Sequence, residues 1–351
     1  MKKSFLLQLL LLAWVFNSCI DPLELDTASD ASRLVVDGRI TNEPGPYSVR
    51  LSTSEPYATY TDSWDAVVTG ATVVVADDKG NQETLTETKP GLYQTSPDGI
   101  QGQIGNAYTL SIITKDGNAY VSVPELLLPV PEIDTIYTAL HEQQIINPEG
   151  IVETNYNVEV YVDAREPGDS KNYYRWQSEG VYRVSTQPWD YSEKVRGIRV
   201  PMPKDCCEVC WVTSVAGSVN VSDDRVMNGR SIRRRLVAQI PVNAQTFESK
   251  YYLEVKQSSL SEAAFDFWST LKAQTSNVVS IQDPPPAMVV GNISNKNDPG
   301  EKVLGFFGAS AVSSKSIFIR REDLSVNPGP LILPDDCRVL PFSTTERPAF
   351  W

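Results

Sequence analysis

The sequence has a single histidine, His141, among its 351 residues, and this scarcity limits the catalytic chemistry available to the chain. A Ser-His-Asp or Cys-His group would have to use His141, and one histidine cannot supply an H-E-x-x-H zinc motif. No Gly-x-Ser-x-Gly nucleophile elbow is present. The polar stretch from His141 to Gln144 precedes a predicted loop, so we expect an exposed loop histidine. We therefore predict no catalytic residue and no enzymatic activity.

Signatures of cofactor and metal binding are also missing. Gly291 and Gly300 lack the Lys-Ser/Thr ending of a phosphate loop. The segment from Asp77 to Gly80 faintly resembles a calcium loop, but it has no glutamate at the twelfth position, and a hairpin turn explains it better. Acidic residues are numerous, yet no pair stands out as the two carboxylates of a glycosidase. We expect no metal and no cofactor, and a secreted hydrolase is the least favoured function.

Basic residues are in deficit, with 31 Lys and Arg against 44 Asp and Glu and a formal net charge of −13. Removal of residues 1–18 would take away Lys2 and Lys3 and no acid, so a mature chain would carry −15. This charge argues against nucleic-acid binding, which rewards basic surfaces. It also argues against a protein that lies flat on anionic lipid.

Long apolar runs are absent too, because the run from Phe5 to Phe16 is too short to span a bilayer. Lys2 and Lys3 precede this run, and the small residue Ser18 follows it, which is the pattern of a secretory signal peptide over residues 1–18. Cys19 directly after Ser18 is the mark of a bacterial lipoprotein, so we predict that Cys19 carries the lipid. Residues 19–32 are acidic and rich in small side chains, which predicts a tether. The expected location is the outer membrane, lipid-anchored, at the cell surface.

Four further cysteines, Cys206, Cys207, Cys210 and Cys337, are candidates for disulfides, because an exported protein meets an oxidising environment. The clustering suggests one bridge from the cluster to Cys337 and a second bridge inside the cluster, although sequence alone leaves three connectivities open. A Cys₄ zinc site is the alternative. It is disfavoured because Cys337 stands alone and Cys206 is adjacent to Cys207.

Residues 33–128 contain about seven short alternating segments with turn signals between them and no helical pattern. The segment from Tyr47 to Leu51 alternates apolar and polar residues, and Asp116-Gly117 is a hairpin signal. We therefore predict a mainly β fold that starts with an Ig-like or transthyretin-like β-sandwich. Pro129 and Pro131 then predict a semi-rigid linker.

Residues 132–351 predict a larger β-rich sandwich domain with one packed helix. Residues 154–163 alternate cleanly and predict a half-buried strand. Ser259 and Glu262 have capping-box spacing, which predicts a helix over 262–274. The segments 303–311 and 316–320 predict a hairpin, and Asp283–Pro286 predicts a break. The Pro-rich tail from Arg321 is expected to wrap the domain, held by Cys337.

Aromatic residues are dense between Tyr173 and Trp211, and two of them, Trp189 and Tyr191, lie in a predicted loop beside Pro188. Exposed aromatic side chains on loops stack on sugars or anchor partner proteins. We therefore consider Trp189 and Tyr191 as contacts for a ligand or partner. Tyr174, Trp176 and Tyr182 of the same region are expected to be ordinary core residues.

Several short motifs occur in an order that resembles a known family. They are Leu34–Asn42, Gly91-Leu92-Tyr93, Gly105–Tyr108, Asp116–Tyr120, Gly291-Asn292-Ile293 and Val303–Phe307. Together they resemble the Bacteroidetes outer-membrane lipoproteins known as domain of unknown function four-two-four-nine. The resemblance implies lipoproteins that are often encoded beside TonB-dependent receptors, and it supplies no catalytic residues.

These observations lead to one expected function and one alternative. The expected function is a lipid-anchored binding or accessory subunit of a TonB-dependent nutrient transporter, with that receptor as partner. The alternative is a standalone adhesin or an envelope-structural lipoprotein. The sequence does not identify the ligand.

Overall fold

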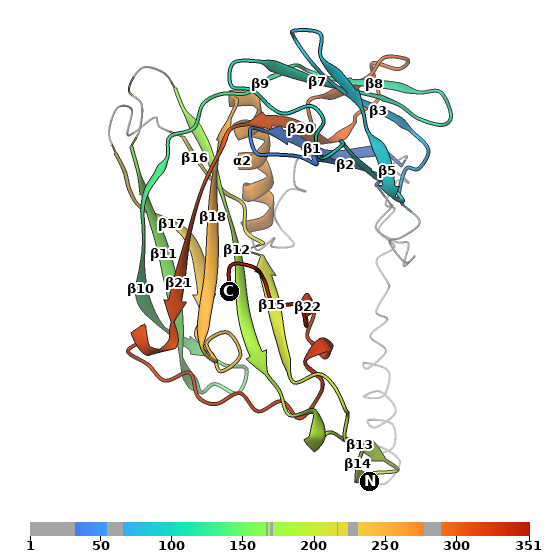
Figure 1. Cartoon of the computed structure of the whole chain (residues 1–351). Coiled ribbons are helices and arrows are strands. Elements are labelled where there is room, and N and C mark those ends of the chain that lie inside the picture. The colour runs from blue at the N-terminus through green and yellow to red at the C-terminus, as the bar shows by residue number, and fades with distance from the viewer. Residues whose placement is uncertain are drawn as a thin grey trace, which may run out of the picture.

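The structure is a computed structural model that describes residues 32–54, 66–165, 168, 171–215, 217–223, 231–276 and 289–351. The predicted signal peptide (1–18), Cys19, most of the predicted tether and the predicted break at Asp283–Pro286 lie outside these residues. The described part is mainly β, as predicted, and forms two β-rich modules with one α-helix between them (Figure 1).

The N-terminal module is a β-sandwich of two sheets. One sheet contains β1 (Leu34–Thr41), β2 (Ser48–Thr53), β5 (Thr86–Lys89), β6 (Leu92–Gln94) and β20 (Leu304–Ser310). The other contains β3 (Thr72–Asp77), β4 (Gln82–Thr84), β7 (Ala107–Ile113), β8 (Ala119–Ser122), β9 (Glu125–Leu126) and β19 (Ile293–Asn295). Alternation determines which side chains face inward, since Tyr108, Leu110 and Ile112 of β7 are all buried.

Two C-terminal strands complete this sandwich, which differs from the predicted boundary between residues 33–128 and 132–351. β20 pairs in parallel with β1, with Val36 opposite Gly305, and β19 pairs with β8. The predicted hairpin between 303–311 and 316–320 is therefore wrong. The two segments are strands, but β20 belongs to the N-terminal module and β21 (Val312–Arg320) pairs with a strand of the second module.

The second module also has two sheets. The first contains β10 (Ile133–Ile146), β11 (Val152–Ala164) and β17 (Ile232–Pro241). The second contains β12 (Tyr173–Ser185), β15 (Val209–Val215), β16 (Asn220–Asp223), β18 (Lys250–Leu260), β21 and β22 (Ser343–Thr344). Val158, Val160 and Val162 of β11 are buried in the core between them, as the alternation predicts.

His141 is exposed, but the prediction that it lies in a loop is wrong. It lies within β10, opposite Asn157 of β11. The local run His141–Gln144 is polar because this end of the β10–β11 pair is solvated on both faces, and polarity alone does not distinguish such a strand from a loop.

The helix α2 (Glu262–Ser276) matches the predicted span within two residues, but its cap differs from the prediction. Ser261 is the N-cap, because its Oγ accepts the backbone N–H of Ala264 at 3.1 Å. Ser259 still belongs to β18, where its hydroxyl donates to the carbonyl of Leu128 at 2.6 Å and accepts the N–H of Ala311 at 3.0 Å. Ser259 therefore joins the two modules rather than starting the helix.

The linker between the modules is held by both of them. Leu127 is fully buried in the N-terminal core. Gln257 of β18 donates to the carbonyl of Pro131 at 2.9 Å and accepts the buried indole N–H of Trp176 at 2.9 Å. These contacts fix the two modules relative to each other, so the surface between them is built by both.

Candidate functional site

A β-hairpin of β13 (Ser192–Val195) and β14 (Ile198–Pro201) forms the end of the molecule opposite the N-terminal module (Figure 1). The chain reverses at Arg196 and Gly197, whose φ angles of 48° and 88° are those of a type I′ turn. This hairpin was not predicted, although Gly197 between Val195 and the alternating Ile198-Arg199-Val200 is a turn signal that could have found it.

One face of the hairpin carries three apolar side chains together with Glu193, and all four are exposed. Val195 pairs with Ile198, and Val200 lies two residues further along the same face. These side chains are 45%, 70% and 38% exposed, respectively. Lys194 pairs with Arg199 on the opposite face. An amphipathic strand pair normally buries its apolar face, so this face is suited to contact another surface.

The structure places the two predicted contact aromatics at the base of this hairpin, in different environments. Trp189 lies in the short helix η1 (Pro188–Asp190) and is 54% exposed. Tyr191 is partly buried: Lys204 Nζ lies 3.9 Å from its ring centroid, and its hydroxyl donates to Glu193 at 3.1 Å. Trp189 is therefore available for contact, whereas Tyr191 supports the hairpin. We call Trp189, Val195, Ile198, Val200 and Met202 the apolar tip.

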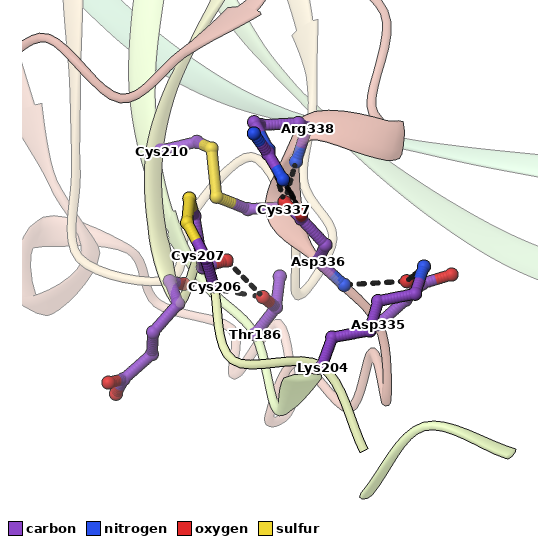
Figure 2. A network of polar contacts seen from close by, with 10 residues as sticks. Thr186, Lys204, Cys206, Cys207, Cys210, Asp335, Asp336, Cys337 and Arg338 are labelled. Carbon is purple, nitrogen blue, oxygen red and sulfur yellow. Dashed lines mark hydrogen bonds and ion pairs between the residues drawn. A yellow bond between two sulfur atoms is a disulfide. The ribbon is translucent and has the colours of Figure 1, made fainter. Parts of the chain in front are cut away.

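Two disulfides, Cys206–Cys207 and Cys210–Cys337, lie where the chain leads from the apolar tip into β15 (Figure 2). This pairing has one bridge from the cysteine cluster to Cys337 and one inside the cluster, as the clustering suggested. Cys210 and Cys337 are fully buried in the core of the second module. The C-terminal tail is thereby fixed against β15.

Polar contacts reinforce the attachment around these disulfides. The backbone N–H of Cys337 donates to the carbonyl of Cys207 at 3.0 Å. Lys204 Nζ forms an ion pair with Asp335 Oδ1 at 2.5 Å (Figure 2). The backbone N–H of Gln187 donates to the carbonyl of Leu333 at 2.9 Å. The tail therefore supports both ends of the segment that carries the apolar tip.

Asp336 is a nearly buried carboxylate at this attachment. It accepts the backbone N–H of Arg338 at 2.9 Å and the guanidinium Nε of Arg338 at 2.9 Å (Figure 2). These hydrogen bonds lower the pKa of Asp336 to about 2, although burial opposes the change. A lowered carboxyl pKa stabilises the fold above the unfolded pKa of 3.8, and this stabilisation is lost as the pH falls toward 2.

Asp336→Asn should lower the free energy of unfolding at neutral pH by about 1–2 kcal/mol, because the amide loses the charge-assisted bonds. Stability should also depend less on pH between about pH 4 and pH 2 than in the unsubstituted protein. Urea unfolding across this pH range measures both effects, with the exposed Asp98→Asn as control. Equal pH dependence in the Asp336 variant and the unsubstituted protein would contradict the assignment.

A cleft of about 440 Å³ lies between the two modules and is the second candidate site. One wall is the outer face of the β20-β1-β2-β6-β5 sheet, and the other is formed by β12, β18 and α2. Arg39 of β1 donates to the side-chain carbonyl of Gln177 on β12 at 2.6 Å, and Lys256 pairs with Glu43 at 2.9 Å. These polar contacts connect the walls near the cleft.

This cleft was not predicted, because its residues come from elements far apart in the chain. Arg39 and Arg50 occupy outward positions of their strands, which indicate only a solvated face. Among the residues that the structure describes, no group of histidine, cysteine or acidic side chains has the arrangement of a metal site. Cys19, the predicted lipidation site, lies outside the described residues.

Comparison with known proteins identifies one family. The family model described as Domain of unknown function (DUF4249) matches residues 20–316. No curated protein matches the chain. Among the described residues, no helix combines the length and apolar character needed to cross a membrane.

Proposed function

Since this chain belongs to the family described as a domain of unknown function, DUF4249, we propose its function from its own features. It is a lipid-anchored lipoprotein of the outer membrane that faces the cell surface and acts as a non-catalytic binding or accessory subunit of a TonB-dependent nutrient transporter. The lipid anchor is Cys19, behind the signal pattern of residues 1–18. The partner class is the one that the family resemblance implies.

The observation that carries the partner role is the apolar tip. Ile198 is 70% exposed on a protruding hairpin, directly opposite the exposed Val195 and two residues from the exposed Val200. Such surfaces on otherwise polar proteins mark contacts with other proteins. Trp189 adds an exposed aromatic side chain of the kind that dominates interface energies.

The position of the apolar tip also supports this role. It lies at one end of the molecule, and the N-terminal module and the cleft lie toward the other (Figure 1). The Cys210–Cys337 disulfide and the contacts of the tail fix its base, so little conformational freedom is lost when it binds. We therefore propose that the apolar tip contacts the extracellular surface of the barrel.

Co-purification tests the proposal. The full-length lipoprotein, extracted from native membranes in mild detergent, should bring down a TonB-dependent barrel in a near-equal amount. The double variant Trp189→Ser/Ile198→Ser should reduce the recovered barrel by about tenfold or more, because it removes the aromatic anchor and the most exposed aliphatic group of the hairpin.

The matched control is Ile104→Ser, which changes an isoleucine of similar exposure (55%) in the N-terminal module. It should leave recovery of the barrel unchanged. A lipoprotein recovered only as a free species would contradict the transporter role and favour the adhesin or envelope-structural alternative. Unchanged recovery with the double variant would contradict the apolar tip as the contact surface.

A further inference from the structure

The cleft between the modules collects three arginines from both of its walls. Asp37 and Arg39 lie two residues apart on one face of β1, and Arg50 of β2 is directly opposite Asp37 in the antiparallel register. Arg175 reaches the cleft from β12 on the opposite wall. Two separate modules thus direct their guanidinium groups into one concave space.

The charges in this cleft are not balanced by the protein. Asp37 is the one acidic residue among the described residues that line it, against three arginines, whereas the whole chain carries an excess of acids. None of the three arginines forms an ion pair with a described residue. Like charges gathered in a concave space repel one another. A bound anion would offset this repulsion.

Arg175 is held in place and keeps a hydrogen-bond donor without a partner among the described residues. Its guanidinium carbon lies 3.6 Å from the ring centroid of Trp268 on α2, which holds the group flat. Its Nε is buried and has no hydrogen-bond partner among the described residues. Burial, and then the charge of Arg39, lower the pKa of Arg175 to about 10, so the group stays charged at neutral pH.

We propose that this cleft binds a small organic oxyanion, a molecule that carries a carboxylate or phosphate group. Guanidinium groups bind these oxyanions through paired, charge-assisted hydrogen bonds. The volume of about 440 Å³ is at the lower end of small-molecule sites, which suits a ligand the size of a monosaccharide or dipeptide. Leu92 and Leu260 supply apolar lining beside the arginines.

This inference goes beyond the proposed function, because it concerns the ligand and a surface separate from the apolar tip. A protein with no barrel partner would still bind the oxyanion if the cleft is its site. Variants in the cleft should leave co-purification unchanged, and variants in the apolar tip should leave ligand binding unchanged. The failure of one proposal is therefore distinguishable from the failure of the other.

The test is calorimetric titration of the full-length protein in mild detergent with three related probes: glucose, glucuronate and glucose 6-phosphate. The sugar is common to all three, and only the group at C6 changes from neutral to carboxylate or phosphate. We expect at least one of the two anions to bind and glucose not to bind. The preferred anion identifies the oxyanion as carboxylate or phosphate. No binding of either anion at about 10 mM, or equal binding of glucose, would overturn the proposal.

Variants then locate the site. Arg175→Gln and Arg50→Gln should each weaken binding of the preferred anion by about ten- to hundredfold, because each removes a charge-assisted hydrogen-bond donor. Arg50 is exposed, so its variant tests the cleft even if the Arg175 variant does not fold. The control is Arg199→Gln on β14, which should bind like the unsubstituted protein. Unchanged affinity in Arg50→Gln, or an equal loss in Arg199→Gln, would overturn the assignment to the cleft.

Discussion

Replacement of both Cys210 and Cys337 by serine should lower the free energy of unfolding by about 3–5 kcal/mol. The disulfide joins residues 127 positions apart, so its removal restores a large loop entropy to the unfolded chain. Both cysteines are fully buried, so the serine hydroxyls would also lie in an apolar core. This bridge is the main covalent attachment of the C-terminal tail to the segment that carries the apolar tip.

Urea unfolding of the oxidised proteins measures the effect. The matched control is Cys206→Ser/Cys207→Ser, which removes the disulfide between adjacent residues. That bridge closes almost no chain loop, so its loss should cost less than about 1 kcal/mol. Equal losses in the two double variants would show that loop closure is not what the Cys210–Cys337 bridge contributes.

The second large effect is expected from Gly305→Ala, which should destabilise the protein by about 2–5 kcal/mol. Gly305 has a φ of +85°, a conformation that costs a residue with a side chain about 1–2 kcal/mol. A Cβ at this position would lie 1.9 Å from the carbonyl oxygen of Val36 on the neighbouring strand. Because that atom is backbone, β20 would have to move away from β1.

Gly308→Ala is the control, since it changes a glycine of the same strand. The nearest atoms to its added Cβ are 3.9 Å away, in the ring of Phe306, so the methyl group fits. Thermal or urea unfolding should show little change, or a gain of a few tenths of a kcal/mol from the stiffer unfolded chain. Similar behaviour of the two variants would contradict the close contact between β20 and β1.

The sequence was sufficient to predict strands and helices that a periodic pattern within their own residues determines. The alternation through Val158, Val160 and Val162 predicts β11 because burial on one face repeats every second residue. The apolar residues Ala264 and Trp268 predict α2, because residues four positions apart lie on one face of a helix. In both cases the pattern and the structure depend on the same neighbouring residues.

Pairing between distant segments could not be predicted in this way. Val303–Ala311 indicates a strand, but nothing in it indicates that its partner is β1, about 270 residues earlier. The capping residue was misplaced because Ser259 and Ser261 both suit an N-cap, and only the continuation of β18 to Leu260 decides between them. The cleft was missed for the same reason, since Arg39 and Arg175 meet only after the modules associate.

The central claim of a surface-exposed subunit that docks through its apolar tip is tested most directly in living cells by site-specific photo-cross-linking. A photoreactive amino acid at Trp189 should produce one adduct between the lipoprotein and a TonB-dependent barrel. The same amino acid at Ile104, in the N-terminal module, should produce none. A missing adduct at Trp189, or the same adduct from both positions, would contradict the claim.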